Sequence, residues 1–151
     1  MKRLFILMFA VLACKMAGAQ ATATALNVRN NKSCATYCII IMSTSSTNPC
    51  DPTTCVSSNV LSIAAGATLH YTTSAPPPGI GSTVYDFIGA KIMDGPISCS
   101  PTTTFIGEPC ATIVHNINIH IADPNNSCQI CDNSNAVWGP TVGTTGYLEW
   151  Y

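Results

Sequence analysis

Two cysteines in the second half of the chain have the spacing of a chemically active pair. Cys128-Gln129-Ile130-Cys131 is a C-x-x-C motif, which serves redox centres and zinc sites because it places two sulfurs near one helix N-terminus or one metal. A redox centre needs a strand before the motif and a helix after it, whereas Asn and Asp turn residues flank this one. Zinc needs two further ligands, either Cys34 and Cys38 or histidines. Because exported cysteines usually oxidise, we expect disulfides here.

The chain after a predicted signal peptide over residues 1–19, which we call the mature chain, holds an even number of cysteines. This predicts up to four disulfides in an exported protein. Cys34 and Cys38 would lie about 13 Å apart on one extended strand, at roughly 3.3 Å per residue, and therefore cannot pair with each other. Two local pairs are predicted, Cys50 with Cys55 and Cys99 with Cys110. The predicted disulfide residues are Cys34, Cys38, Cys50, Cys55, Cys99, Cys110, Cys128 and Cys131.

The histidines do not form a metal-binding pattern. His115 and His120 have an odd spacing, so they lie on opposite faces of a predicted strand and cannot share a metal without a bulge between them. We expect His115 to be a hydrogen-bonded core residue and place His120 and His70 at the surface. No metal site and no cofactor are predicted.

One oxygen-rich loop keeps calcium open as an alternative. The segment 123–127 places oxygen side chains at alternate positions, as calcium loops do, but it lacks the glycine and the distal bidentate glutamate of an EF-hand. We predict an Asn-rich turn here. The calcium alternative would use Asp123 and Asn125, with help from Asp132.

No catalytic signature is present in the sequence. The seven carboxylates include no pair that the sequence itself places across a sugar, as a glycosidase requires. There is no G-x-S-x-G, no H-E-x-x-H and no phosphate-binding glycine loop. We therefore predict a protein that is not an enzyme, with a carbohydrate-active enzyme as an alternative.

The aromatic residues are the candidates for ligand binding. Tyr and Trp rings cover the apolar faces of sugars while amides bond to their hydroxyls, and this chain is rich in Asn. Each candidate is also expected to be partly in the core. The candidates are Trp138, Trp150, Tyr147, Tyr151 and Tyr71.

The elements that must position these residues are predicted to be strands. After residue 20 no window sustains apolar residues at three- and four-residue spacing, and β-branched Thr, Val and Ile dominate. The sequence predicts an all-β fold, an antiparallel β-sandwich of about eight strands with disulfides and little or no helix. The expected strands are 24–30, 36–43, 60–64, 67–72, 83–93, 103–106, 111–121 and 146–151.

Three of these segments have informative patterns. Residues 113–121 alternate, with the isoleucines and His115 on one face and Asn116, Asn118 and His120 on the other. Residues 39–42 are apolar on both faces, which favours a central strand over one that meets a partner chain. Residues 147–151 alternate too, and the pattern predicts a terminal strand with Leu148 and Trp150 on the same face.

The first nineteen residues have the pattern of a signal peptide. A basic start precedes an apolar run from Leu4 to Ala13, and small residues follow just before Gln20. The run is too short to cross a bilayer, and no later segment is long enough. We therefore predict a signal peptide over 1–19 and a single secreted domain over 20–151, extracellular or periplasmic. A lipid anchor at Cys14 is the less favoured alternative.

The net charge of the mature chain limits the classes of partner that it can bind. Three of the six basic residues lie in the leader, so the remainder carries 3 basic and 7 acidic side chains, a net charge of 3 − 7 = −4. Three scattered cations cannot form a nucleic-acid-binding surface. We predict a non-enzymatic binding module or an extracellular structural and assembly module, with carbohydrate or a second copy as partner. A membrane-inserting β-protein is the remaining alternative.

Overall fold

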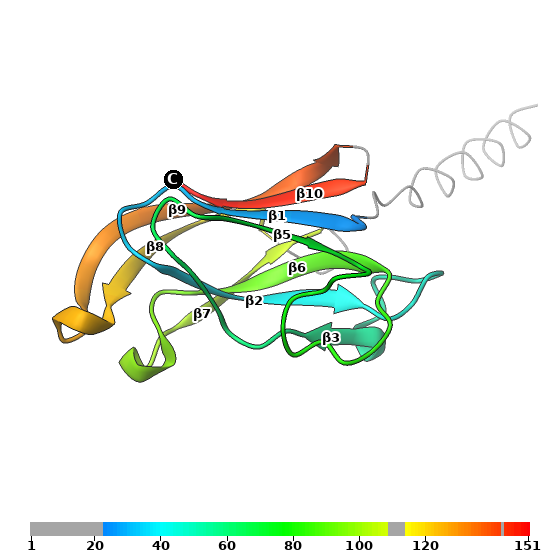
Figure 1. Cartoon of the computed structure of the whole chain (residues 1–151), viewed down its shortest axis with the longest axis horizontal. Coiled ribbons are helices and arrows are strands. Elements are labelled where there is room, and N and C mark those ends of the chain that lie inside the picture. Colours follow the sequence, from blue (N-terminus) through cyan, green and yellow to red (C-terminus); the bar gives the residue numbers. More distant parts are fainter. Residues whose placement is uncertain (1–22, 109–113, 143) are drawn as a thin grey trace, which may run out of the picture.

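The computed structural model describes residues 23–108, 114–142 and 144–151 as two β-sheets that face each other (Figure 1). The predicted all-β, disulfide-containing sandwich is confirmed, and no α-helix occurs in these three ranges. The strands are β1 (Ala25–Asn30), β2 (Thr36–Ser43), β3 (Cys55–Ser57), β4 (Leu61–Ile63), β5 (Thr68–Thr72), β6 (Asp86–Met93), β7 (Thr103–Gly107), β8 (Asn116–Asp123), β9 (Gln129–Val142) and β10 (Thr145–Trp150). Short 3-10 helices are η1 (Pro52–Thr54), η2 (Ile97–Cys99) and η4 (Pro124–Asn126).

The first sheet joins the two ends of the described chain. Its strand order is β5-β1-β10-β9-β8, and β1 runs parallel to β10, from Ala25 opposite Thr145 to Asn30 opposite Trp150. The other strand pairs are antiparallel. This one pair departs from the antiparallel prediction. A parallel pair needs a long connection, and here the connection is nearly the whole domain.

The second sheet is built around β2, its central strand. The order is β3-β2-β6-β7, and β4 also pairs with β2. β3 and β4 follow each other along one edge of β2, opposite residues 41–43 and 36–38. Ile40 and Met42 are buried in the core, while Ile39 and Ile41 are half-buried on the outer face. The prediction of a central strand for 39–42 is confirmed.

The core lies between the sheets and follows from period-two alternation. In β10 every second residue is buried, which places Leu148 and Trp150 inside as predicted. Trp138, from β9, and Phe87, from β6, are the other largest fully buried residues. Burial of such side chains supplies most of the driving force for folding.

Most strand predictions hold, and the failures have local causes. β9 was missed because Asn, Asp and Ser between residues 131 and 135 are typical of turns, and the three-residue strand β3 was missed as well. Ile117, Ile119 and Ile121 point inward, whereas Asn118 and His120 are exposed, as expected. His70 is exposed as predicted. His115 is exposed too, so its assignment to the core was wrong; β8 begins only at Asn116, after it.

Two disulfides fasten the β8–β9 hairpin to the rest of the molecule. Cys34 pairs with Cys131, and Cys99 pairs with Cys128. The turn of the hairpin therefore lies beside the β6–β7 loop (Figure 1). Both C-x-x-C cysteines are thus oxidised to separate partners, which excludes the zinc and redox alternatives.

Neither predicted local disulfide is correct. Cys99 bonds to Cys128 rather than Cys110, because the hairpin turn folds back onto η2, a contact distant in sequence. Cys50 is disulfide-bonded, but Cys55 is free, and Cys38 is free and buried in the core. The prediction that these last two cysteines form disulfides was therefore wrong. Cys110, residues 111–113 of the predicted eighth-strand segment, the leader and Cys14 lie outside the described residues.

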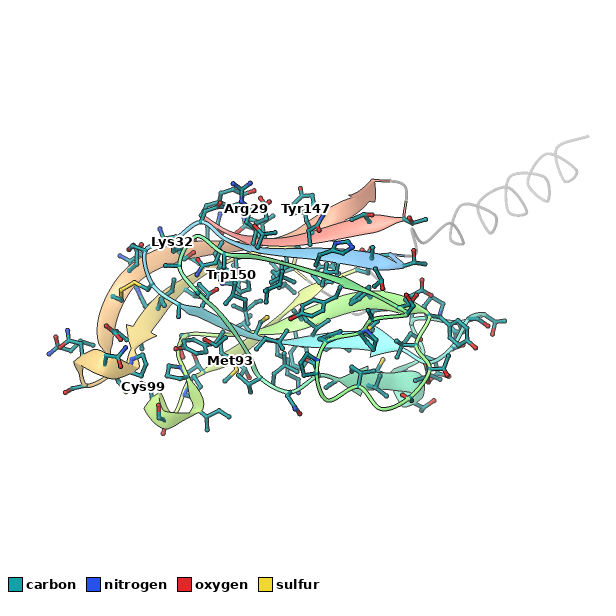
Figure 2. The ribbon with its side chains drawn as sticks, in the orientation of Figure 1. Arg29, Lys32, Met93, Cys99, Tyr147 and Trp150 are labelled. Atoms are coloured by element: carbon teal, nitrogen blue, oxygen red, sulfur yellow. A yellow bond between two sulfur atoms is a disulfide. The ribbon has the colours of Figure 1, made fainter. Side chains whose placement is uncertain are left out.

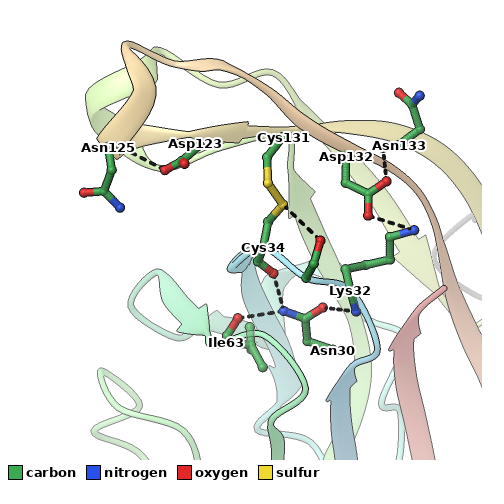
Figure 3. The surroundings of a disulfide bond; sticks show 10 residues. Asn30, Lys32, Cys34, Ile63, Asp123, Asn125, Cys131, Asp132 and Asn133 are labelled. Atoms are coloured by element: carbon green, nitrogen blue, oxygen red, sulfur yellow. Dashed lines mark hydrogen bonds and ion pairs between the residues drawn. A yellow bond between two sulfur atoms is a disulfide. The ribbon is translucent and has the colours of Figure 1, made fainter.

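Buried Asn30 fixes the crossover from β1 to β2. Its Nδ2 donates to the carbonyl oxygens of Cys34 (2.7 Å) and Ile63 (2.9 Å), and the Lys32 N–H donates to its Oδ1 (2.9 Å). Figure 3 shows this amide directly below the Cys34–Cys131 disulfide. The side chain thereby satisfies backbone groups that leave the sheet at the point where the chain changes layer.

Candidate functional site

The outer surface of the first sheet carries polar side chains on all five strands, and we call it the polar face. The alternation that sends Leu26, Val28, Leu148 and Trp150 inward sends their neighbours outward. Cross-strand register then aligns the outward residues in rows. The polar face comprises Asn27, Arg29, Thr68, His70, Asn116, Asn118, His120, Asn133, Asn135, Tyr147, Glu149 and Tyr151.

A hollow of about 380 Å³ lies at one end of this face, and we call it the amide groove. It forms because β8 and β9 place Asn118 opposite Asn135 and His120 opposite Asn133. Tyr151 follows β10, and its N–H and C=O exchange hydrogen bonds with Asn135 (3.1 Å each). The residues that line the groove are Asn118, Ile119, His120, Asn133, Ser134, Asn135 and Tyr151.

The side-chain amides of the amide groove differ in their hydrogen bonds and in their exposure. His120 Nδ1 donates to Asn133 Oδ1 (2.5 Å), which orients both side chains. Asn135 Oδ1 is buried and has no hydrogen-bond partner in the structure, whereas the Asn118 side chain is exposed. Exposed amides both donate and accept, so this surface can bond to hydroxyl groups of a ligand.

Two tyrosine rings belong to the polar face. Tyr151 is 53% exposed, and its hydroxyl donates to Glu149, a bond that raises the pKa of Tyr151. Tyr147 covers Gly139 of β9, where a Cβ atom would lie 1.7 Å from the ring carbon Cζ. Figure 2 shows Tyr147 and Arg29 on the outer side of the sheet and Trp150 between the sheets. Residues 147 and 151 are about 13 Å apart along an extended strand.

The structure separates the five predicted ligand-binding aromatics into two groups. Tyr147 and Tyr151 are on the polar face, as a binding role requires. Trp138 and Trp150 are 1% and 0% exposed and cannot present a ring to a ligand, so this prediction was wrong for both. Tyr71 points inward and packs against the core, and burial raises the pKa of its hydroxyl. The strand alternation decides this separation.

The three calcium candidates do not converge. Asp123 caps η4, with its Oδ1 accepting from the N–H of Asn125 (2.8 Å). Asp132 instead forms an ion pair with Lys32 (3.1 Å) and accepts from the N–H of Asn133 (2.7 Å). Figure 3 places Asp123 and Asp132 on opposite sides of the Cys34–Cys131 disulfide. Within the ranges that the structure describes, no three His, Cys, Asp or Glu side chains form a metal-binding group.

The carboxylates have local structural partners instead of forming a catalytic pair. Glu108 accepts from the Trp138 indole (3.0 Å), and Asp94 accepts from the N–H of Thr102 (2.8 Å). Asp51 caps η1, where bonds from Thr53 lower its pKa. No carboxylate lines the amide groove. The groove therefore contains no acid–base pair of the kind that glycoside hydrolysis uses.

The two free thiols among the described residues, those of Cys38 and Cys55, are poor nucleophiles. Burial raises the pKa of the Cys38 thiol far above its ordinary value. Burial and the charge of Asp51 also raise the pKa of Cys55. Since the thiolate is the reactive form, neither cysteine has the environment of a catalytic residue.

The groove amides were not predicted as site residues. Asn133 and Asn135 lie on β9, which the sequence did not predict as a strand. The usable signal was the alternation of Ser134, Ala136 and Trp138, all of which are buried, with outward positions occupied by Asn133, Asn135 and Val137. Once β9 is placed, the predicted outward face of β8 supplies Asn118 and His120 opposite.

The fold and the groove define a two-sheet, disulfide-linked β-sandwich with an amide- and tyrosine-lined surface. Searches against protein families, curated proteins and solved structures found no match to this chain. The described part of the chain contains no helix with the length and hydrophobicity to span a membrane.

Proposed function

We propose that this protein is a secreted, non-enzymatic binding module that recognises a neutral, polyhydroxylated ligand, a polysaccharide, on the polar face. The observation that carries the proposal is the amide groove, where the exposed amide of Asn118 lies near the exposed ring of Tyr151. Sugars present hydroxyl groups at their edges and apolar C–H groups on their ring faces. Amides and an aromatic ring complement these two surfaces.

Charge supports a neutral ligand. The polar face carries one basic and one acidic residue, Arg29 and Glu149, which are cross-strand neighbours. An anionic polysaccharide would require several unpaired cations. Lys32, at the rim of this sheet, is already paired with Asp132. Recognition by hydroxyl–amide bonds and ring contact is expected to persist at high salt, because screening weakens ionic contacts most.

Affinity electrophoresis of the mature, oxidised protein through gels that contain single polysaccharides tests this function. We expect retardation by a neutral polysaccharide, with similar retardation at low and high salt. Tyr151→Ala should weaken the affinity about two- to tenfold, because aromatic contacts contribute ~0.5–1.5 kcal/mol beyond the area that they bury. Asn118→Ala should weaken it as well, because it removes an exposed amide from the groove.

Tyr85→Ala is the matched control, since Tyr85 is 43% exposed and precedes β6 in the other sheet. Its retardation should equal that of the wild type. The proposal is contradicted if no neutral polysaccharide retards the protein. It is also contradicted if Tyr85→Ala and Tyr151→Ala lose affinity equally.

A further inference from the structure

β5 forms an open edge of the first sheet. Among the described strands it pairs only with β1, from Thr68 opposite Arg29 to Thr72 opposite Ala25, and Figure 1 shows the two strands side by side. Its sequence, Thr-Leu-His-Tyr-Thr, has no proline, no glycine and no Lys, Arg, Asp or Glu. Proline and charged side chains are among the features with which proteins usually protect an edge strand from pairing with another chain, and β5 has neither.

The register shows which backbone groups of β5 face outward. Asn30 N–H donates to Ala67 O (2.9 Å) and Thr73 N–H donates to Thr24 O (3.0 Å), so odd-numbered residues of this segment bond to β1. In an antiparallel ladder the alternate residues direct their N–H and C=O away from that neighbour. These residues are Thr68, His70 and Thr72. Thr72 exchanges bonds with Ala75 (3.2 and 3.1 Å), which leaves Thr68 and His70.

The other sheet edges are shorter or partly tied to neighbouring segments. β3 has three residues. On β7, Ile106 bridges to Val114. On β8, the Ala122 N–H donates to Asp94 O (2.7 Å), and the following turn is bonded to η2 through Cys128–Cys99. β8 also directs the backbone groups of Asn116, Asn118 and His120 outward, but it is tied near both ends, whereas β5 has no backbone hydrogen bond to a described strand other than β1.

We propose that a second copy of this chain pairs with this edge, β5 against β5 and antiparallel, about a two-fold axis at Leu69. Thr68 of each copy then faces His70 of the other, and each of these two residue pairs exchanges two backbone hydrogen bonds. This register uses all four outward groups of each copy. A two-fold centre at either neighbouring residue would leave some of them unpaired.

A second copy fits the edge because the edge is complementary to itself. The four outward groups are two donors and two acceptors, placed symmetrically about Leu69, so an identical strand satisfies each of them. Leu69 is half-buried and packs against the core. Its remaining exposed surface would meet Leu69 of the other copy across the non-hydrogen-bonded position, where side chains are closest.

Such a dimer would join the first sheets of two copies into one continuous sheet. In an antiparallel pair, residues opposite each other point to the same side, so both polar faces would lie on one surface. If the proposed polysaccharide recognition is correct, the dimer would engage one polymer at two places. The interface contributes few residues per copy, so we expect a dissociating dimer whose population rises with concentration.

Sedimentation velocity on the mature, oxidised protein over a wide concentration range tests the pairing without any ligand. The wild type should shift from monomer towards dimer as concentration rises. His70→Pro removes one outward N–H while leaving the bonds of Leu69 and Tyr71 to β1, because proline is tolerated at the solvent side of an edge strand. This variant should remain a monomer. His70→Ala is the matched control, since it loses the same side-chain bond to Asn27 but keeps the N–H, and it should dimerise like the wild type.

Cross-linking tests the register and does not depend on the proline variant folding. In a Cys55→Ser background, Thr68→Cys and His70→Cys proteins are oxidised separately and as a mixture. The proposed register predicts disulfide-linked dimers in the mixture and few in either protein alone, because only residues 68 and 70 face each other. A wild type that stays monomeric at every concentration overturns the proposal. So does an equal dimer yield in all three samples, or His70→Pro dimerising as the wild type does. Because polysaccharide is absent, these outcomes are independent of the proposed binding function.

Discussion

At the scale of single residues, the two buried tryptophans differ in how their indole nitrogens are satisfied. Trp138 Nε1 donates to buried Glu108 at 3.0 Å. Trp150 Nε1 has no partner in the structure, although the side chain is fully buried. A buried polar group without a partner costs free energy, whereas a satisfied one contributes little net stability until its partner is removed.

Replacing each tryptophan by phenylalanine should therefore have unequal effects. Trp138→Phe leaves the Glu108 carboxyl without its donor, which should lower the free energy of unfolding by ~1–3 kcal/mol in addition to the packing loss. Trp150→Phe removes an unsatisfied donor, which offsets part of its packing loss. Guanidinium unfolding with the disulfides intact measures both. A larger loss for Trp150→Phe would contradict this account.

The buried carboxyl group of Asp86 should make the free energy of unfolding depend on pH. It is 5% exposed, and burial raises its pKa above the ordinary value of 3.8. The folded state then binds the proton on Asp86 more tightly than the unfolded state does. The contribution of Asp86 to the free energy of unfolding is therefore fully present below pH 3.8 and is lost as the pH rises through the folded-state pKa. Asp86→Asn should be more stable than the wild type at pH 7, with the difference shrinking towards pH 3. Urea unfolding at both pH values measures this, and an unchanged difference would argue against it.

At the scale of elements, β9 does the most to create the candidate site. Its inward residues Ala136 and Trp138 anchor it in the core, and its outward amides complete the groove with β8. Gly139 leaves room for Tyr147 of the neighbouring strand β10, which covers the gap that a glycine leaves in a sheet. One strand thus links core packing to the composition of the polar face.

At the scale of the whole molecule, the disulfides Cys34–Cys131 and Cys99–Cys128 connect segments that the sheets alone would not join. Cys34–Cys131 spans 97 residues of sequence and links the β1–β2 crossover to β9. Cys99–Cys128 spans 29 residues and links the β6–β7 loop to the turn of the β8–β9 hairpin. Both fasten the hairpin that carries six of the seven residues lining the amide groove, so they hold the candidate site against the second sheet.

Removing the longer link should cost more stability than removing the shorter one. The loop-entropy relation gives ~4.7 kcal/mol for a loop of about 100 residues and roughly 3.6 kcal/mol for one of about 30. Paired replacements, Cys34→Ala with Cys131→Ala and Cys99→Ala with Cys128→Ala, keep a thiol from being left unpaired. Thermal unfolding of the two double variants should show the lower Tm for the first. The reverse order would mean that local packing, not chain entropy, dominates.

The sequence by itself determined the all-β class, the inward positions of Leu148 and Trp150, and the oxidation of the C-x-x-C cysteines. These are local or compositional properties, since alternation needs only neighbouring residues and an even cysteine count needs no coordinates. The sequence also identified Tyr147 and Tyr151 as binding candidates, but not their separation from Trp138 and Tyr71. That separation depends on which face of a sheet meets the core.

Only the tertiary structure decided the disulfide partners, the free state of Cys38 and Cys55, and the parallel pairing of β1 with β10. Each depends on contacts between segments distant in sequence, which loop length and local turn chemistry do not specify. The amide groove is of the same kind. Asn118 and Asn135 become neighbours only through the β8–β9 register, and Tyr151 joins them because the last strand lies beside β9 in the same sheet.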